Sequence, residues 1–187
     1  HIRFQAVHFA YTTKPVLQNF NLEIEAGKVV AIVGPTGHGK STIVQLLTRF
    51  YEPQQGGIFL DRYPLQEIHL ASLRQHVSIV LQDNVLFSGS ILDNLRLVQS
   101  EASDQQLIQA IEDLGADEIL QQLPQGYFTE VGTLGKNLSH GQRQLVCLVR
   151  AYLADPKILI LDEATSAIDI YTEQKIQFAL RRLCQNR

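Results

Sequence analysis

Apolar and polar residues alternate along two stretches near the N-terminus, IRFQAVHF and VLQNFNLEI. This period of two predicts two strands of an antiparallel sheet, with YTTKP as the turn between them. A turn at residues 25–28 is followed by a continuous apolar run that is rich in β-branched residues. This run, residues 28–33, predicts a fully buried parallel strand. A further pair of strands is predicted at residues 57–60 and 76–81.

Helical spacing of apolar residues replaces the strand pattern between about residue 83 and residue 138. Ser90 and Asp104 are the expected N-caps in this stretch, because their side-chain oxygens can accept a backbone N–H. The main domain resumes after it, and KILILDEA predicts a second buried strand. The predicted helices span residues 41–50, 90–97, 104–114, 116–123, 142–153 and 171–183. The alternation of helices and strands indicates an α/β protein with an inserted helical lobe.

Composition narrows the possible functions. With 187 residues, 45% of them hydrophobic, the chain can bury one substantial core and a smaller lobe. Its 16 basic and 19 acidic residues give a net charge of -3, which does not indicate a nucleic-acid-binding surface. Cys147 and Cys184 are too few for a disulfide framework and predict reduced thiols in a cytosolic protein. No signal peptide is evident, and the apolar runs are too short to span a bilayer, so a membrane role requires a partner.

The stretch GPTGHGKS, residues 34–41, matches the phosphate-loop pattern GxxxxGK[ST] at every fixed position. It stands between a predicted buried strand and a predicted helix, as the pattern requires. Its glycines allow a sharp turn that presents backbone N–H groups to an anion at the helix N-terminus. Lys40 can reach the β- and γ-phosphates, and Ser41 can coordinate Mg²⁺. These residues predict a nucleoside triphosphate site.

Two other stretches carry candidate chemistry. ILILDEATSAID places Asp162 at the carboxyl end of a predicted buried strand, where open α/β sheets bind ligands. Asp162 could hold Mg²⁺ and Glu163 could polarise an attacking water, although the pair could instead favour a helix N-terminus. LSHGQ, residues 138–142, combines a small hydroxyl residue, a glycine and polar side chains just before a helix. Its chemistry also suits a phosphate.

In order and spacing, GPTGHGKST, LSHGQ and ILILDEATSAID together resemble the nucleotide-binding domains of ABC transporters. The resemblance covers essentially the whole chain, and LSHGQ is similar to the signature motif of that family. It implies an α/β phosphate-loop (RecA-like) ATPase core with an N-terminal antiparallel β subdomain and an inserted α-helical subdomain. The implied boundaries are residues 1–83 for the β subdomain and phosphate loop, 84–141 for the helical signature subdomain, and 142–187 for the rest of the core.

The resemblance implies that two such domains pair head to tail, with ATP between the phosphate loop of one and the signature of the other. Loss of the γ-phosphate would then weaken the pairing. The implied nucleotide-binding residues are Tyr11, Gly34, Pro35, Thr36, Gly37, His38, Gly39, Lys40, Ser41 and Thr42. The residues implied to act across the dimer are Leu138, Ser139, His140, Gly141, Gln142 and Asp169. The implied catalytic residues are Lys40, Gln82 and Glu163, and the implied Mg²⁺ ligands are Ser41, Gln82 and Asp162.

Three of these positions have alternative interpretations. Tyr11 matches an aromatic residue that stacks on adenine, but it could be an exposed turn tyrosine. Gln82 matches a glutamine that contacts Mg²⁺ or the attacking water and senses the transmembrane partner, but it could simply end a strand. Asp169 matches a loop that reaches across the dimer, or it caps the following helix.

Residues 88–95, in LFSGSILDNL, and residues 129–135, TEVGTLG, resemble segments of exporters whose membrane part is fused upstream. The signature departs from the family at His140, where glycine is usual; a histidine can be tolerated there if its side chain points to solvent, since only the flanking residues need approach the phosphate. His38 occupies a variable position of the phosphate loop and is also expected to face solvent. Thr133 stands where exporters often have glutamate, which affects a coupling contact rather than catalysis.

The resemblance also implies a switch histidine that follows Glu163 and one more strand. All six histidines of this chain precede Glu163, and the sequence ends at Arg187. The chain is therefore expected to be truncated before the switch histidine and the final strands of the core. Weak turnover or none is expected from it, even if nucleotide binds.

The leading prediction is the ATP-binding and hydrolysing domain of a membrane exporter, at the cytoplasmic face of a membrane and with the bacterial inner membrane as the expected location. Its expected partners are a transmembrane domain, on the same or another polypeptide, and a second nucleotide-binding domain. The isolated chain is expected to be a soluble monomer that binds no nucleic acid. The alternatives are an ABC-type ATPase acting on nucleic acid or ribosomes, and a nucleotide-gated switch with little turnover. A kinase or GTPase is disfavoured, because neither an NKxD-type sequence nor an arginine-rich lid is evident.

Overall fold

The computed structural model describes residues 1–35, 37–81, 83–162 and 169–185. These residues form two compact units, His1–Val77 and Ser78–Gln185, and each unit is described by itself. The predicted boundaries after residues 83 and 141 stay predictions.

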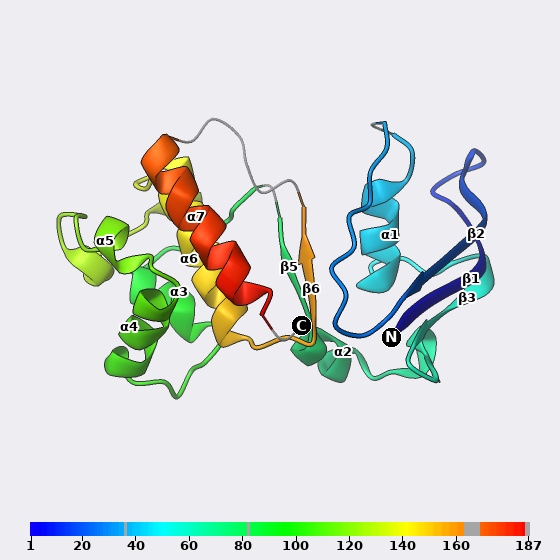
Figure 1. Cartoon of the computed structure of the whole chain (residues 1–187), viewed down its shortest axis with the longest axis horizontal. Helices are drawn as coiled ribbons and strands as arrows, with labels where there is room; N and C mark the ends of the chain where they lie inside the picture. The colour runs from blue at the N-terminus through cyan, green and yellow to red at the C-terminus, as the bar shows by residue number, and fades with distance from the viewer. Residues whose placement is uncertain (36, 82, 163–168, 186–187) are drawn as a thin grey trace. The chain divides into compact units, whose positions relative to one another are not determined.

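The N-terminal unit contains an antiparallel sheet (Figure 1). Its strands are β1 (Ile2–Ala10), β2 (Pro15–Ile24), β3 (Gln55–Leu60) and β4 (Tyr63–Pro64), in the order β2-β1-β3-β4. The unit also contains α1 (Lys40–Leu47), a 3₁₀ turn η1 (Leu65–Glu67) and α2 (Leu70–His76). The two N-terminal strands and the helix after the phosphate loop are therefore confirmed, whereas α2 was missed because its seven residues are too few to show a clear helical period.

An irregularity in β1 explains its hydrophobic pattern. Phe4 and Val7 are both buried although three positions separate them, because Ala6 between them adopts a left-handed conformation with φ of 48°. Asn19, in the neighbouring strand, is also left-handed, with φ of 47°. The register of the β1–β2 pair shifts at this point. A bulge of this kind returns the following apolar residues to the core face of the sheet.

Two side chains bind the backbone groups that this bulge leaves outside the ladder. Asn21 Oδ1 accepts the N–H of Ala6 at 2.9 Å, and Asn21 Nδ2 donates to the carbonyl oxygen of Asn19 at 2.8 Å. His8 lies with Nδ1 3.0 Å from the carbonyl oxygen of Ala6, and its Nε2 accepts the N–H of Asn19 at 3.2 Å. Because a backbone N–H can only donate and a carbonyl can only accept, this arrangement requires a neutral His8 with its hydrogen on Nδ1.

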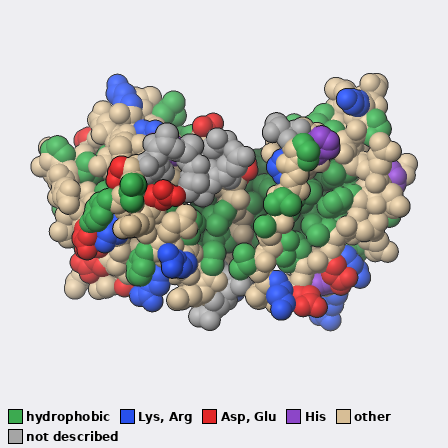
Figure 2. Space-filling model, turned by 45° about the horizontal axis from the view of Figure 1, so that its top comes forward, with side chains coloured by type: hydrophobic (Ala, Val, Ile, Leu, Met, Phe, Trp, Pro, Cys, Tyr) green, Lys and Arg blue, Asp and Glu red, His purple; other side chains and the backbone are tan. Residues whose placement is uncertain are grey.

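The predicted buried strand at residues 28–33 is wrong. These residues form no strand, and Val29 and Val33 are 81% and 87% exposed. Hydrophobic side chains accordingly reach the surface of this unit in Figure 2. A strand needs a neighbour for its backbone N–H and C=O groups, and the described residues of this unit supply none here. The apolar run predicted burial, which these residues do not show, and it could not specify a partner strand.

The second unit combines a two-stranded sheet with a helical cluster (Figure 1). The sheet pairs β5 (Val77–Val80), at the boundary of the unit, with β6 (Ile158–Leu161). The strands predicted at residues 57–60 and 76–81 are confirmed as β3 and β5, but they lie in different sheets, because β3 pairs with β1 and β4. The helices are α3 (Ile91–Arg96), α4 (Asp104–Asp113), α5 (Asp117–Leu120), α6 (His140–Leu153) and α7 (Ile170–Leu183), with 3₁₀ turns η2 (Gly126–Phe128) and η3 (Thr133–Gly135).

Helix α6 lies at the centre of the helical cluster. Its Leu145, Val146, Leu148 and Val149 are fully buried and belong to one apolar core with residues of α3, α4 and α7. These residues recur at helical spacing, which is why the sequence predicted the helix. No helix in the described part of the chain is both long enough and apolar enough to cross a membrane.

Helix starts in this unit follow the capping rules. Ser90 caps α3, as predicted, and its side chain accepts the N–H of Asp93 at 3.1 Å. The predicted cap of α4 is wrong by one residue, because Ser103 accepts the N–H of Gln106 and Asp104 is the first helical residue. Gln106 returns the bond to the N–H of Ser103, and this reciprocal pair favours Ser103 as the cap.

We predict that Asn21→Ala lowers the free energy of unfolding of the chain by about 1 kcal/mol, because two exposed hydrogen bonds from the Asn21 side chain to the backbone are lost at the bulge. Urea denaturation monitored by circular dichroism measures this. Gln18→Ala, at an exposed position of the same strand, is the control and should change stability much less. Equal effects of the two variants would show that Asn21 does not hold the bulge.

Candidate functional site

The phosphate loop ends in a left-handed glycine that begins α1. Gly39 is the N-cap of α1 with φ of 87°, and no side chain of the described residues caps the helix. A Cβ on Gly39 would lie 3.0 Å from Leu17 Cδ2 and 3.3 Å from Val16 Cγ1, so the backbone passes close to β2. Both the conformation and the close approach favour glycine here. The first N–H groups of α1 therefore remain available to an anion, which the helix dipole also favours.

Lys40 folds back over its own loop. Its Nζ donates to the carbonyl oxygens of Gly34 at 2.7 Å and Pro35 at 2.9 Å. An ammonium group has three donors, so these two bonds orient the charge and still allow one to a ligand oxygen. Gly34, Pro35, Gly37 and Ser41 are exposed, as is His38, whose exposure was expected. The loop thus presents a positive charge and backbone N–H groups together at an accessible surface.

Tyr11 and Thr42 meet beside this loop. The hydroxyl of Tyr11 lies 3.0 Å from Thr42 Oγ1, and Thr42 is buried in the first turn of α1. The ring of Tyr11 is 46% exposed and packs edge-on against Phe9, with 4.9 Å between ring centroids. A partly exposed ring next to a phosphate loop is suited to stacking on a base. This contact was not visible in the sequence, where 31 positions separate Tyr11 from Thr42.

The predicted Mg²⁺ ligands belong to both units. Ser41 lies in the first turn of α1, and Asp162 directly follows β6, where its N–H donates to the carbonyl oxygen of Val80 at 3.0 Å. Asp162 therefore ends the sheet, as predicted. Thr36, Gln82 and Glu163 lie outside the described residues, so their roles remain predictions.

The signature LSHGQ forms the start of α6. Ser139 is the N-cap and is exposed, while Leu138 and Gly141 are buried in the helical unit. Ser139 Oγ accepts the N–H of Gln142 at 3.2 Å, and Gln142 Oε1 accepts the N–H of Ser139 at 2.8 Å. This capping box fixes the helix start and does not use the hydrogen of the Ser139 hydroxyl.

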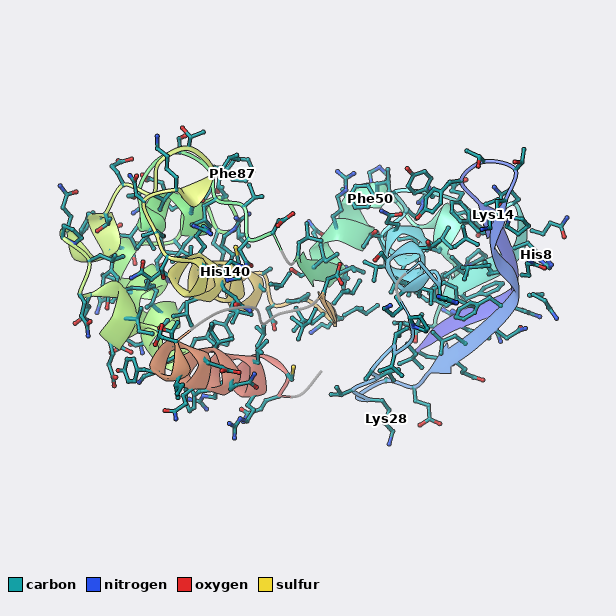
Figure 3. The ribbon with its side chains drawn as sticks, turned by 90° about the horizontal axis from the view of Figure 1, so that it is seen from above. His8, Lys14, Lys28, Phe50, Phe87 and His140 are labelled. Carbon is teal, nitrogen blue, oxygen red and sulfur yellow. The ribbon has the colours of Figure 1, made fainter. Side chains whose placement is uncertain are left out.

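The condition that the His140 side chain points to solvent is met only in part. His140 is the first residue of α6 (Figure 3) and is half-buried. Its Nδ1 is buried and has no hydrogen-bond partner within the described ranges. Leu138 before it and Gly141 after it both pack into the unit, which draws the histidine toward the protein. The histidine therefore places a polar ring nitrogen at the start of α6, where the family usually has glycine.

The sequence did not predict a role for Arg143, which holds the backbone around the signature. Its Nη1 donates to the carbonyl oxygens of Leu138 at 2.7 Å and Gly135 at 3.3 Å. The guanidinium thereby joins the signature to the end of the TEVGTLG segment. Gly135 is left-handed with φ of 77°, and a Cβ there would lie 2.7 Å from Arg143 Cδ. An arginine one residue after the signature was the available sequence signal.

The two segments singled out by the exporter resemblance lie side by side. Ser90 forms a bridge with Glu130, and the N–H of Val131 donates to the carbonyl oxygen of Gly89 at 2.9 Å. Asn94 is buried and holds the first segment. Its Oδ1 accepts the N–H of Phe87 and its Nδ2 donates to the carbonyl oxygen of Phe87, each at 2.8 Å. These segments therefore form one structural feature, although 40 positions separate Ser90 from Glu130 in the sequence.

Asp169 caps the helix that follows it. Its carboxylate accepts the N–H of Thr172 at 2.9 Å, at the start of α7. The hydrogen bonds from Thr172 hold the pKa of the Asp169 carboxyl below its ordinary value. The alternative interpretation of this residue as a helix cap is thus confirmed, whereas its proposed contact across a dimer stays a prediction.

Comparison with known proteins identifies the family. The sequence pattern of the ABC transporter family matches residues 17–166. The ABC transporter ATP-binding protein YknV of Bacillus subtilis is 48% identical over 187 residues, covering 100% of this chain and 31% of that protein. ABC transporter B family member 14 of Arabidopsis thaliana is 42% identical over 189 residues, covering 100% of this chain and 15% of that protein.

A solved structure agrees with this assignment. A bacterial Atm1-family ABC exporter with ATP bound superposes with a TM-score of 0.91 and 40% sequence identity, covering 100% of this chain and 33% of that one. The chain therefore belongs to the ABC transporter family. The predicted fold class and family are confirmed. The chain spans about a third or less of the length of these relatives.

Because the folded pKa of Asp169 is lowered, the stabilisation from its charged cap is fully present above the ordinary value of 3.8 and is lost as the pH falls through the folded pKa. We predict that NMR titration of the Asp169 carboxyl gives a pKa below 3.8. The stability difference between the unsubstituted chain and Asp169→Asn should shrink over the same pH range. Glu173→Gln, in the first turn of the same helix, is the control. Titration of Asp169 at or above its ordinary value would contradict the cap.

Proposed function

We propose that this chain binds and hydrolyses Mg-ATP and thereby powers export of a substrate across a membrane. The observation that carries the proposal is the start of α1, where the described residues place no side-chain cap on the first backbone N–H groups and Lys40 folds over the same loop. The similarity to an Atm1-family exporter whose structure has ATP bound supports the same ligand. Several named relatives are transporters, which favours transport over action on nucleic acid or ribosomes.

The chemistry requires a metal ion and a positioned water. Hydroxyl, carboxylate and amide oxygens are donors that suit Mg²⁺, and Ser41, Asp162 and Gln82 are the proposed ligands. When bound, the ion neutralises charge on the phosphate oxygens. Lys40 binds the β- and γ-phosphates, and Glu163 orients or deprotonates the water for in-line attack. Tyr11 stacks on the adenine.

A second domain completes the site in this proposal. The exposed Ser139 hydroxyl, at the start of α6, donates to the γ-phosphate held by the phosphate loop of the other copy. ADP lacks this phosphate, so the closed dimer binds ATP more tightly and opens after hydrolysis. A transmembrane domain, fused upstream or carried by a partner chain, converts closing and opening into transport at the cytoplasmic face.

We predict that Lys40→Ala weakens Mg-ATP binding to the chain by about 10- to 100-fold, since a hydrogen bond to a charged group contributes about 1.5–3 kcal/mol. Isothermal titration calorimetry measures the affinity. Lys28→Ala, which removes another exposed lysine of the same unit (Figure 3), is the control. Unchanged ATP affinity in Lys40→Ala would contradict the assigned site.

In the full-length transporter, Glu163→Gln should trap an ATP-bound dimer of the nucleotide-binding domains, because binding is retained while the water is no longer activated. Size-exclusion chromatography of the detergent-solubilised protein, with nucleotide content measured in the peak, follows this state. An absence of retained ATP under turnover conditions would contradict the role of Glu163.

A further inference from the structure

The hydroxyl of Tyr11 is held from two sides in the N-terminal unit. It donates to Gln45 Oε1 and lies 3.0 Å from Thr42 Oγ1. Because a phenol has a single hydrogen, the bond to Gln45 leaves Thr42 as the donor to the Tyr11 oxygen. Both partners lie on α1, the helix whose N-terminus forms the phosphate loop. The ring is therefore tied to the same element that would hold the phosphates.

Two aromatic neighbours limit rotation of the ring. Phe9 packs edge-on against Tyr11 with centroids 4.9 Å apart, and Tyr51 does so at 5.1 Å, both with interplanar angles of 87°. Phe9 is buried in the sheet, so this side of the ring has a fixed wall. Tyr11 nevertheless keeps 46% of its surface exposed. The contacts restrict its orientation and leave room for a second planar group.

The backbone beside Tyr11 is held by an unusual side-chain contact. Gln54 Oε1 accepts the N–H of Ala10 at 2.9 Å, and Gln54 Nε2 donates to the carbonyl oxygen of Ala10 at 2.7 Å. The backbone N–H of Gln54 donates to the carbonyl oxygen of His8 at 3.0 Å. Pro15, the partner of Ala10 on β2, has no N–H to offer that carbonyl. The Gln54 amide thus extends the sheet to the residue before Tyr11.

We infer that Gln54 and Gln45 are positioning residues that fix the Tyr11 ring for stacking on the nucleobase before nucleotide arrives. This inference rests on the proposed ATP-binding function and adds residues that determine the base-dependent part of affinity. A ring that is already ordered loses less side-chain entropy on binding than a free turn tyrosine does. The phosphate contacts at the start of α1 do not depend on either glutamine.

The test compares two ligands, Mg-ATP and magnesium tripolyphosphate, which share the phosphates but not the base. The variants are Gln54→Met and Gln45→Met, which keep side-chain length and remove the amide, and Tyr11→Phe, which keeps the ring and removes the hydroxyl. Gln55→Met is the matched control, because Gln55 is the exposed neighbour of Gln54. Isothermal titration calorimetry on the chain gives both affinities for each variant.

We expect the three variants to weaken ATP binding about three- to ten-fold, with tripolyphosphate binding and the Gln55→Met control unchanged. The double variant Tyr11→Phe/Gln45→Met should bind ATP as Tyr11→Phe alone does, because the hydrogen bond lost in Gln45→Met is already lost in Tyr11→Phe. Parallel weakening for both ligands would assign the glutamines a general structural role and overturn the inference. Unchanged ATP affinity in all three variants would overturn it as well.

Two results separate this inference from the proposed function. If the unsubstituted chain binds ATP and tripolyphosphate equally, and both require Lys40, the phosphate site stands and base recognition through Tyr11 fails. If the chain binds neither ligand, the nucleotide site itself fails and the inference fails with it. If Gln54→Met does not fold, Gln45→Met and Tyr11→Phe still decide the outcome, because they remove only the hydrogen bonds of the Tyr11 hydroxyl.

Discussion

The packing of Gly39 against β2 is the constraint on which the nucleotide site depends. A left-handed residue without a Cβ lets the backbone pass Leu17 and Val16 closely and enter α1 with its first N–H groups uncapped. Lys40 follows at once and folds back over the loop through two carbonyl oxygens. The Lys40 ammonium group, the first backbone N–H groups of α1 and the Tyr11 ring are therefore all positioned by one helix. That helix packs against the sheet at Gly39.

The two phosphate-type sequences have opposite designs at their helix starts. Within the described part of the chain, the start of α1 has no side-chain cap, whereas the start of α6 is closed by the reciprocal bonds of Ser139 and Gln142. An open helix start can hold several phosphate oxygens through its N–H groups, but a capped one offers chiefly an outward hydroxyl. This difference fits our proposal that one loop grips the nucleotide and the other completes the pocket from a second copy.

The sequence predicted the elements that depend on local signals. Strands β1 and β2 followed from alternation, α6 from helical spacing, and the start of α1 from the phosphate-loop pattern. Residues 28–33 failed because an apolar run reports a tendency toward burial but not the neighbour that would pair with it. The contacts of Tyr11 with Gln45 and of Gln54 with Ala10 join segments more than 30 residues apart, so no local pattern could reveal them.

The central claim is that ATP joins the phosphate loop of one copy to the signature of another. Disulfide crosslinking tests it most directly, with His38→Cys and Ser139→Cys introduced into a full-length transporter in which Cys147 and Cys184 are replaced by serine. Mild oxidation should give an intermolecular crosslink with Mg-ATP and Glu163→Gln present, and little with ADP. A crosslink that forms equally with either nucleotide, or none with ATP, would contradict the account.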